Sequence, residues 1–376
     1  MPLTATRIAA DTATVTVASL TPAVADWSRR YFGPWWNAGT IDAPAPDRIA
    51  DSGGLVLADT DPGRVDDIAT LVRDYGHDET VYANARTLVA RHDGITYAVQ
   101  PDERIGYQAN GRRLVIVGDE PEPVAVAAAR LARELVRGQL LAEGWTVLHA
   151  SAATQNGDAV LTLGDKGAGK TTSALLLARA GWGLLANDRV FVRPEPDGRV
   201  RVLPWPSAAA LGLGLLDATG LYDQVREKVL AGGQLHPTQH PTVTQALMDG
   251  RREPLWKDTG KELKPQFFPD QLSTWLGLTL SISANVAGLL FPTMDPGATP
   301  APVGSDRRLT EADIFDDKTE DRYPDIFGLT PTTTTGTEAL TEHLARLPRR
   351  SLVLSHDTDA SAALLAKTAE ELTASH

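Results

Sequence analysis

Residues 164–171, GDKGAGKT, have the types and spacing of a phosphate-binding loop. They fit the Walker A pattern G-x-x-x-x-G-K-[ST] without a mismatch. They also lie between an apolar stretch at 159–163 and a helical pattern at 171–180, which is the strand-loop-helix context that the motif requires. Glycines let consecutive backbone N–H groups approach phosphate oxygens, and the helix N-terminus adds positive potential. The pattern therefore predicts a nucleotide-phosphate site, and the structural alternative is a glycine-rich turn with an incidental lysine.

Each residue of this loop has a predicted part in holding a nucleotide. Lys170 is expected to reach the β- and γ-phosphates, and Thr171 is expected to place its hydroxyl on Mg2+. Thr172 is expected to assist the start of the helix. The rest of the cradle is made of backbone amides, and these belong to Gly164, Asp165, Lys166, Gly167, Ala168 and Gly169.

Asn187 and Asp188 close the next apolar stretch, WGLLAN, and put a carboxylate 18 positions after Lys170. In a doubly wound sheet such a residue lies at the carboxyl end of a strand, beside the phosphates. Asp188 could hold Mg2+, or it could accept the proton of an attacking hydroxyl. The structural alternative is a surface aspartate that ends a strand.

His149 lies 15 residues before the loop, after the apolar stretch TVL. A neutral imidazole near a phosphate site can take part in the chemistry, or it can simply bind backbone groups. A single histidine is more often structural than catalytic, and the spacing alone leaves both roles open.

The composition excludes several classes of function. Lys and Arg total 36 against 48 Asp and Glu, and the net charge of -12 disfavours binding to nucleic acid or to an anionic membrane surface. The chain has no Cys, so disulfide frameworks and thiolate chemistry are unavailable. Neither a signal-like N-terminus nor a run of about 18 apolar residues is present. We therefore expect a cytoplasmic protein with no nucleic-acid or membrane partner.

Residues 1–120 are expected to form an N-terminal α+β domain, mostly of strands, that recognises a substrate or partner. Turn signals at 93–94 (Asp-Gly) and 110–111 (Asn-Gly) separate strand patterns and predict a meander. Apolar residues at helical spacing predict a helix at 62–75. The aromatic cluster YFGPWW at 31–36 is either a recognition patch or, by our preference, a small core.

The remaining sequence is divided into a connecting helix at 121–144 and a catalytic domain at 145–376. In the catalytic domain, a turn at Asn156-Gly157 separates two strands, and further buried strands are predicted near 286–292 and 350–355. The stretch 294–325 is dense in Pro, Gly, Asp and Glu and predicts a surface loop or lid.

Taken together, residues 148–192 resemble the catalytic core of bacterial HPr kinase/phosphorylase and, more loosely, the loop of phosphoenolpyruvate carboxykinases. The shared features are His149, the loop at 164–171, a small pair ending in Gly at 180–181, and a strand that closes in Ala-Asn-Asp at 186–188. The resemblance implies a P-loop kinase core of this type and an α/β fold class. It also implies a homo-oligomer.

The same resemblance implies roles for single residues. Lys170 and the loop amides would bind ATP, Thr171 would bind Mg2+, Asp188 would accept the proton of the substrate hydroxyl, and His149 would support the active site. The family has Asp where this chain has Asn187, and the family's glutamate-bearing segment is replaced by RVLPWPSAAALGLGLL, which has no Glu. With these departures, the chain resembles kinases of peptide and natural-product tailoring, and the presence of the reverse, phosphorolytic activity stays open.

Basic residues between 251 and 264 could bind the acceptor. Arg251, Arg252 and Lys261 could neutralise the transferred phosphoryl group or a substrate carboxylate, although a solvated surface is the simpler interpretation. Asn187 is a further candidate for contact with the substrate or its phosphate. The leading hypothesis is an ATP- and Mg2+-dependent kinase that acts on a hydroxyl of a peptide or a small molecule. The alternative is a regulatory or scaffold protein that binds ATP without transferring phosphate.

Overall fold

The computed structural model describes residues 3–42, 53–304, 307–315, 324–331 and 337–374. The chain divides into two compact units after Trp145. Unit 1 is Met1–Trp145 with Asp316–Thr335, and unit 2 is Thr146–Phe315 with Gly336–His376. The long helix at 121–142 belongs to unit 1, where we had expected a connection between domains.

Among the described residues, unit 1 contains a nine-stranded mixed sheet. Its strands are β1 (Thr4–Ala10), β2 (Ala13–Ser19), β3 (Gly39–Ile41), β4 (Gly54–Thr60), β5 (Asp78–Tyr82), β6 (Ala85–His92), β7 (Ile95–Gln100), β8 (Ile105–Asn110) and β9 (Arg113–Gly118). Their order is β3-β1-β2-β4-β9-β8-β7-β6-β5. The predicted meander is confirmed, because β5 to β9 pair in succession as antiparallel neighbours. Asp93 and Gly94 make a turn with positive φ angles of 48° and 75°.

Helices cover this sheet with apolar residues. They are α1 (Pro22–Trp36), α3 (Pro62–Asp74) and α4 (Pro121–Ala142). α1 packs against β1 and α4, α4 packs against β2, β4 and β9, and α3 packs against β7 and β8. In the aromatic cluster, Phe32 and Trp36 stack with ring centres 5.4 Å apart, and Trp35 is 2% exposed. The cluster is therefore core, as we preferred.

Two buried tyrosines take part in hydrogen bonds that link strands β5, β7 and β8 of the meander. The hydroxyl of Tyr107 donates to Gln100 Oε1 at 2.9 Å, and Gln100 Nε2 donates to the carbonyl of Tyr82 at 2.8 Å. Burial raises the pKa of Tyr107 to about 12 and also raises the pKa of Tyr82.

These pKa shifts predict that stability falls in alkali. An unfolded tyrosine loses its proton near pH 10, whereas folded Tyr107 keeps its proton up to about pH 12. The contribution of protonated Tyr107 to the free energy of unfolding is therefore complete below pH 10 and is lost as the pH rises from 10 to 12. In wild type, this titration should lower the free energy of unfolding by up to about 2 to 3 kcal/mol, and Tyr107→Phe should abolish that decrease. Urea unfolding from pH 8 to 11.5 measures it. The exposed Tyr75, changed to Phe, is the control. A slope in Tyr107→Phe equal to that of the wild type would contradict the assignment.

The main sheet of unit 2 is also mixed, and among the described residues it has nine strands. They are β10 (Thr146–Leu148), β11 (Ser151–Gln155), β12 (Asp158–Thr162), β13 (Gly183–Ala186), β14 (Val190–Pro194), β15 (Val200–Pro204), β20 (Ala284–Met294), β21 (Ala301–Pro302) and β22 (Arg349–Leu354). β12 and β22 both run parallel to β20. β13 has the direction of β12, because each is antiparallel to β11. The carboxyl ends of these four strands therefore meet at one edge of the sheet.

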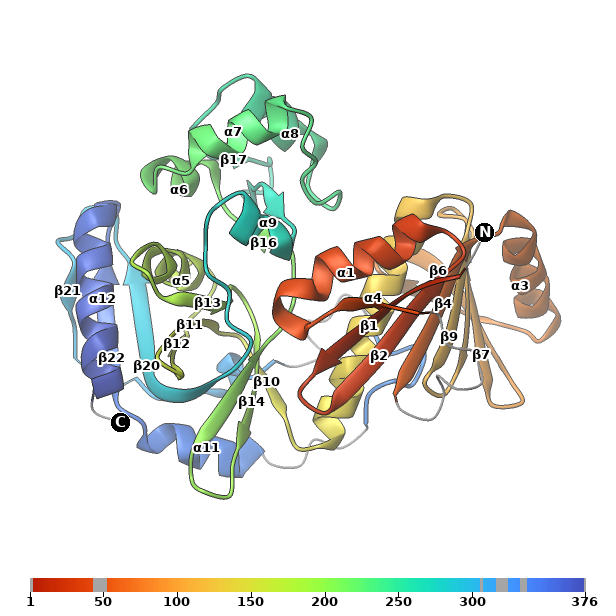
Figure 1. Cartoon of the computed structure of the whole chain (residues 1–376), viewed down its shortest axis with the longest axis horizontal. Coiled ribbons are helices and arrows are strands. Elements are labelled where there is room, and N and C mark those ends of the chain that lie inside the picture. The colour runs from red at the N-terminus through yellow and green to blue at the C-terminus, as the bar shows by residue number, and fades with distance from the viewer. Residues whose placement is uncertain (1–2, 43–52, 305–306, 316–323, 332–336, 375–376) are drawn as a thin grey trace. The chain divides into compact units, whose positions relative to one another are not determined.

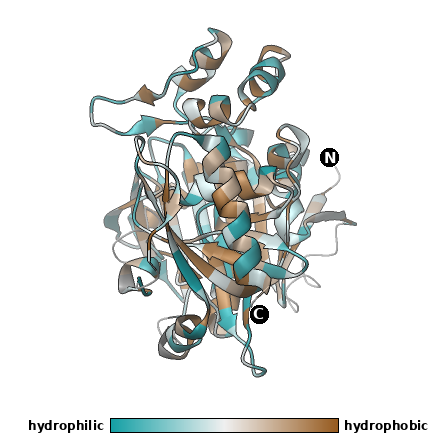
Figure 2. Cartoon of the chain, turned by 90° about the vertical axis from the view of Figure 1, so that its left-hand side faces the viewer, coloured by the Kyte–Doolittle hydropathy of each residue, from teal (hydrophilic) through white to brown (hydrophobic). Residues whose placement is uncertain are grey.

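Both faces of this sheet are buried. The covering helices are α5 (Lys170–Arg179), α11 (Thr337–Arg346) and α12 (Thr358–Ala374). Successive residues of β12 alternate between two apolar cores: Ala159 and Leu161 belong to one, and Val160 belongs to the other. α5 and α12 lie side by side over the second core (Figure 1). In Figure 2, hydrophobic residues follow the strands, and hydrophilic residues gather in the turns.

A largely helical segment is inserted between β15 and β20. Its elements are β16 (Ala209–Ala210), α6 (Leu213–Ala218), α7 (Tyr222–Leu230), α8 (Pro241–Met248), β17 (Leu255–Trp256), β18 (Glu262–Leu263), β19 (Gln266–Phe267) and α9 (Pro269–Thr274). The small strands pair as β16 with β19 and β17 with β18. In the part of the chain that the structure describes, no helix has both the length and the apolar character needed to cross a membrane.

The stretch 294–325 differs from the predicted surface loop. It contains β21 and the short 3-10 helix η1 (Glu311–Asp313), and Asp313 and Phe315 are only 2% and 8% exposed. Ile314 makes a β-bridge with Leu148 of β10, so the segment packs onto the sheet instead of extending into solvent. Residues 305–306 and 316–323 of the predicted lid lie outside the described residues.

Candidate functional site

The glycine-rich loop connects the end of β12 to the start of α5. Gly164, Gly167 and Gly169 have φ angles of 143°, 89° and 100°, a region that residues with a side chain rarely adopt. A Cβ atom on Gly169 would also lie 3.1 Å from Cγ and Sδ of Met294 in β20. The path of the loop therefore depends on glycine at these three positions.

α5 begins at this loop without a side-chain cap. Its N-cap residue is Gly169, and no side chain accepts a hydrogen bond from the first turn. The assistance expected from Thr172 is therefore not seen as a cap. The first N–H groups of a helix have no partner within the helix, so the start of α5 can bind an anion.

Lys170 is held inside the curve of the loop. Its Nζ donates to the carbonyl of Gly164 at 2.6 Å and to that of Asp165 at 3.2 Å. Burial lowers the pKa of Lys170, and the negative charges of Asp188, Asp313 and Asp165 partly offset this effect. A lysine that lacks much of its hydration and faces the curve of the loop can gain from contact with a phosphate.

Asn187 and Asp188 follow β13 at the same edge of the sheet. Thr171 Oγ1 donates to the carbonyl of Asn187 at 3.2 Å, so the loop helix and the end of β13 are in direct contact. Ser207 Oγ donates to Asn187 Oδ1 at 3.5 Å, and Asn187 is buried. The side chain of Asp188 is 52% exposed. The structure thus brings together a buried amide, a hydroxyl and an accessible carboxylate.

His149 lies between β10 and β11, and the ring of Phe315 packs between His149 and Arg189. The backbone N–H of His149 donates to the carbonyl of Asp313 at 2.9 Å, and its ring centre is 5.3 Å from that of Phe315. The guanidinium of Arg189 lies 4.2 Å from the centre of the same ring and 3.6 Å from the carboxylate of Asp188. His149 is therefore connected to the Asp188 region through Phe315 and Arg189.

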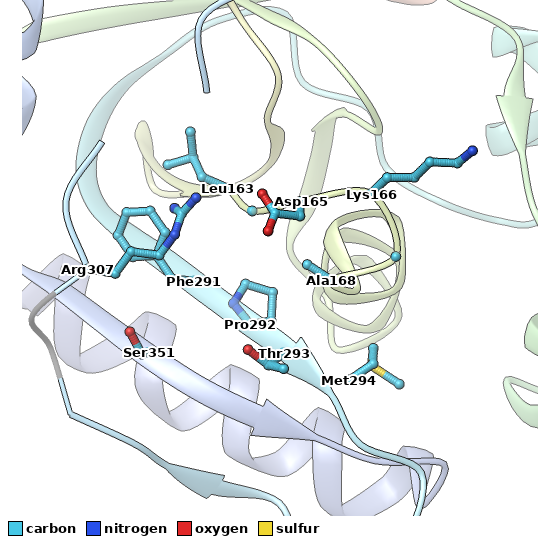
Figure 3. Close-up of a pocket in the computed structure, with 12 residues that line it drawn as sticks. Leu163, Asp165, Lys166, Ala168, Phe291, Pro292, Thr293, Met294, Arg307 and Ser351 are labelled. Carbon is cyan, nitrogen blue, oxygen red and sulfur yellow. The ribbon is translucent and has the colours of Figure 1, made fainter. Parts of the chain in front are cut away.

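A pocket of about 340 Å3 lies between the loop and the end of β20 (Figure 3). Gly164 to Ala168 line one side, and Arg307 lines another. The side chain of Lys166 points away from the other labelled residues in Figure 3 and therefore away from the pocket. Asp165 is on the pocket side.

The predicted acceptor residues lie in the inserted segment of unit 2. Arg252 pairs with Asp217 of α6 and with Asp223 of α7, and its guanidinium lies 4.4 Å from the ring centre of Tyr222. Its charge is therefore already compensated by its own segment. Arg251 and Lys261 are exposed in the turns beside β17 and β18.

The residues around the loop fit Mg2+ better than a metal bound by protein alone. No group of three His, Cys, Asp or Glu side chains that could hold a metal is found within the described ranges. Mg2+ is commonly bound by one or two protein oxygens together with the phosphates of a substrate. The hydroxyl of Thr171 and the carboxylate of Asp188 supply that kind of donor set.

Sequence reasoning missed Arg307, Asp313 and Phe315. They lie in the stretch that we predicted as a surface loop, and no motif marks them. The pairing of Ile314 with Leu148 brings them to the site, and this contact connects residues far apart in the chain.

The packing of Phe315 gives a testable prediction. Its ring contacts His149 and Arg189 and lies 6.2 Å from Trp205, so Phe315→Ala should lower the free energy of unfolding by about 3 kcal/mol. Urea unfolding followed by circular dichroism measures this loss. Val303→Ala, at a 47% exposed position of the same stretch, should cost less than about 0.5 kcal/mol. A cost below about 1 kcal/mol for Phe315→Ala would show that its ring does not hold the site together.

Comparisons with known proteins do not identify a family for this chain. No family model matches the sequence, and no curated protein matches it. Among solved structures, the HPr(Ser) kinase/phosphatase from Coxiella burnetii is similar at 13% identity, with a TM-score of 0.20, over 40% of this chain and 60% of that chain. The match thus spans less than two thirds of that structure, and a TM-score this low does not define a shared fold.

Proposed function

We propose that this protein is an ATP- and Mg2+-dependent kinase that phosphorylates a hydroxyl of a Ser/Thr-like residue in a peptide or of a small natural product. The observation that carries the proposal is the meeting of two features at one sheet edge. The glycine loop with Lys170 follows β12, and the accessible carboxylate of Asp188 follows β13. The motif resemblance of residues 148–192 to HPr kinase/phosphorylase supports the same function.

In the proposed reaction, the acceptor hydroxyl attacks the γ-phosphorus of ATP. A bond forms between the hydroxyl oxygen and phosphorus, the bond from phosphorus to the β,γ-bridging oxygen breaks, and its electron pair leaves with ADP. Asp188 accepts the hydroxyl proton. Lys170 and the backbone N–H groups of the loop stabilise the negative charge on the phosphates. Mg2+ would be held by Thr171 and would supply further positive charge to the phosphates.

The alternative is a protein that senses ATP without transferring phosphate. A sensor needs the cradle but has no need of a base beside it. The half-exposed carboxylate of Asp188 is one of the negative charges that act on Lys170. This proximity favours the kinase.

The role of Asp188 can be tested by Asp188→Asn, which keeps the size of the side chain but removes the base. Transfer should fall by at least about a hundredfold, whereas ATP affinity should stay within a few-fold of wild type. The protein is incubated with metabolite and peptide extracts and labelled ATP, and mass spectrometry identifies products that gain one phosphate. Asp197→Asn, in the exposed turn after β14, is the control. Unchanged transfer in Asp188→Asn would remove Asp188 as the base. A wild-type protein that binds ATP but phosphorylates nothing would favour the sensor.

Lys170→Ala tests the phosphate cradle itself. Removing the ammonium group should weaken ATP binding by at least about tenfold, because the contact between lysine and phosphate is charge-assisted. Equilibrium titration measures the affinity. Lys166→Ala is the control, because the side chain of Lys166 points away from the other residues that line the pocket (Figure 3). Equal affinities of Lys170→Ala and wild type would be incompatible with a phosphate site in the loop.

A further inference from the structure

Arg307 is a second cation beside the loop, from a segment that the motif does not include. It lines the same pocket as Gly164 and Asp165, the two residues whose carbonyls hold Lys170 Nζ. The charge of Arg307 lies close enough to lower the pKa of Lys170. Two positive side chains therefore lie close to the same two loop residues, Gly164 and Asp165.

The guanidinium of Arg307 is fixed on two sides. Its Nη2 donates to Asp313 Oδ1 at 3.1 Å, and its central carbon lies 4.4 Å from the ring centre of Phe291. Asp313 is in turn held by Thr310, whose backbone N–H donates to Oδ2 at 2.9 Å. Figure 3 shows the guanidinium beside the Phe291 ring, on the pocket side of β20. A planar cation held in this way loses little further freedom when it binds an anion.

The hydrogen-bonding capacity of Arg307 is incompletely used. Its Nη1 is buried and has no hydrogen-bond partner among the described residues. A buried donor without a partner carries a free-energy cost that an anionic ligand can remove. The repulsion between Arg307 and Lys170 would also be relieved by negative charge between them.

We propose that Arg307 binds the outermost phosphate of a nucleoside triphosphate together with Lys170, and that Asp313 and Phe291 position its guanidinium. The inference rests on the proposed function, because it requires a nucleotide in the loop. The outermost phosphate is assigned because a loop lysine contacts the β- and γ-phosphates, and Arg307 lies beside the two residues that hold Lys170 Nζ. Arg307 thus distinguishes triphosphate from diphosphate.

The test compares two ligands in the full chain with Mg2+ present. One is ADP, and the other is an ATP analogue with a β,γ-methylene bridge, which cannot be turned over. Arg307→Gln keeps a donor for Asp313 but removes the charge, and Arg307→Lys keeps the charge. Arg308→Gln, at the exposed neighbouring position, is the matched control. Thermal unfolding of each variant verifies that the fold is retained.

Wild type should bind the triphosphate more tightly than ADP. Arg307→Gln should weaken triphosphate binding at least about tenfold and ADP binding less than about twofold. Arg307→Lys should stay within about threefold of wild type for both ligands, and Arg308→Gln should match wild type. Equal losses for the two ligands in Arg307→Gln, or no loss, would overturn the role of Arg307 while leaving the kinase proposal intact. Failure of wild type to bind either ligand would overturn both.

Discussion

The edge of unit 2 is organised around the positive charge of Lys170 in a partly buried position. Two loop carbonyls hold its ammonium group, and these carbonyls point inward because glycines give the loop its left-handed φ angles. Burial would favour the neutral lysine, and the carboxylates of Asp188 and Asp313 oppose that tendency. The loop, the end of β13 and the segment around Asp313 thus act on one charge, although they come from distant parts of the sequence.

Strand direction explains why these groups meet. β12, β20 and β22 are mutually parallel, and β13 acquires the same direction through two antiparallel pairings with β11. Residues that follow these strands must therefore lie on one side of the sheet, where open α/β sheets bind ligands. Burial on both faces fixes the register of β12. A shift of one residue would move Ala159 and Leu161 into the core that now holds Val160, and Val160 into the other core.

The sequence was informative wherever the signal was local. The loop, its glycines, the turn at Asn156 and Gly157 and the buried strands β20 and β22 lie where the patterns predicted them, because each depends on short-range geometry or periodicity. The aromatic cluster in α1 could be interpreted as core for a similar reason, since large aromatic side chains gain most from burial. The α/β fold class was implied by the resemblance of residues 148–192, and the main sheets of both units are mixed.

The contacts of Arg307, Asp313 and Phe315 were not predictable in this way. Their stretch is rich in residues typical of loops, and its burial depends on a bridge between Ile314 and Leu148 that no local pattern encodes. The bridge has a further effect, because β10 lies at one end of the sheet order. The backbone of 313–315 bonds to the side of β10 that does not face β14, through His149 N–H and the carbonyl of Val147. A strand edge whose hydrogen bonds are already made within the chain is a poor template for pairing with another molecule, so the same short segment that contributes to the candidate site also protects this edge of the sheet from aggregation.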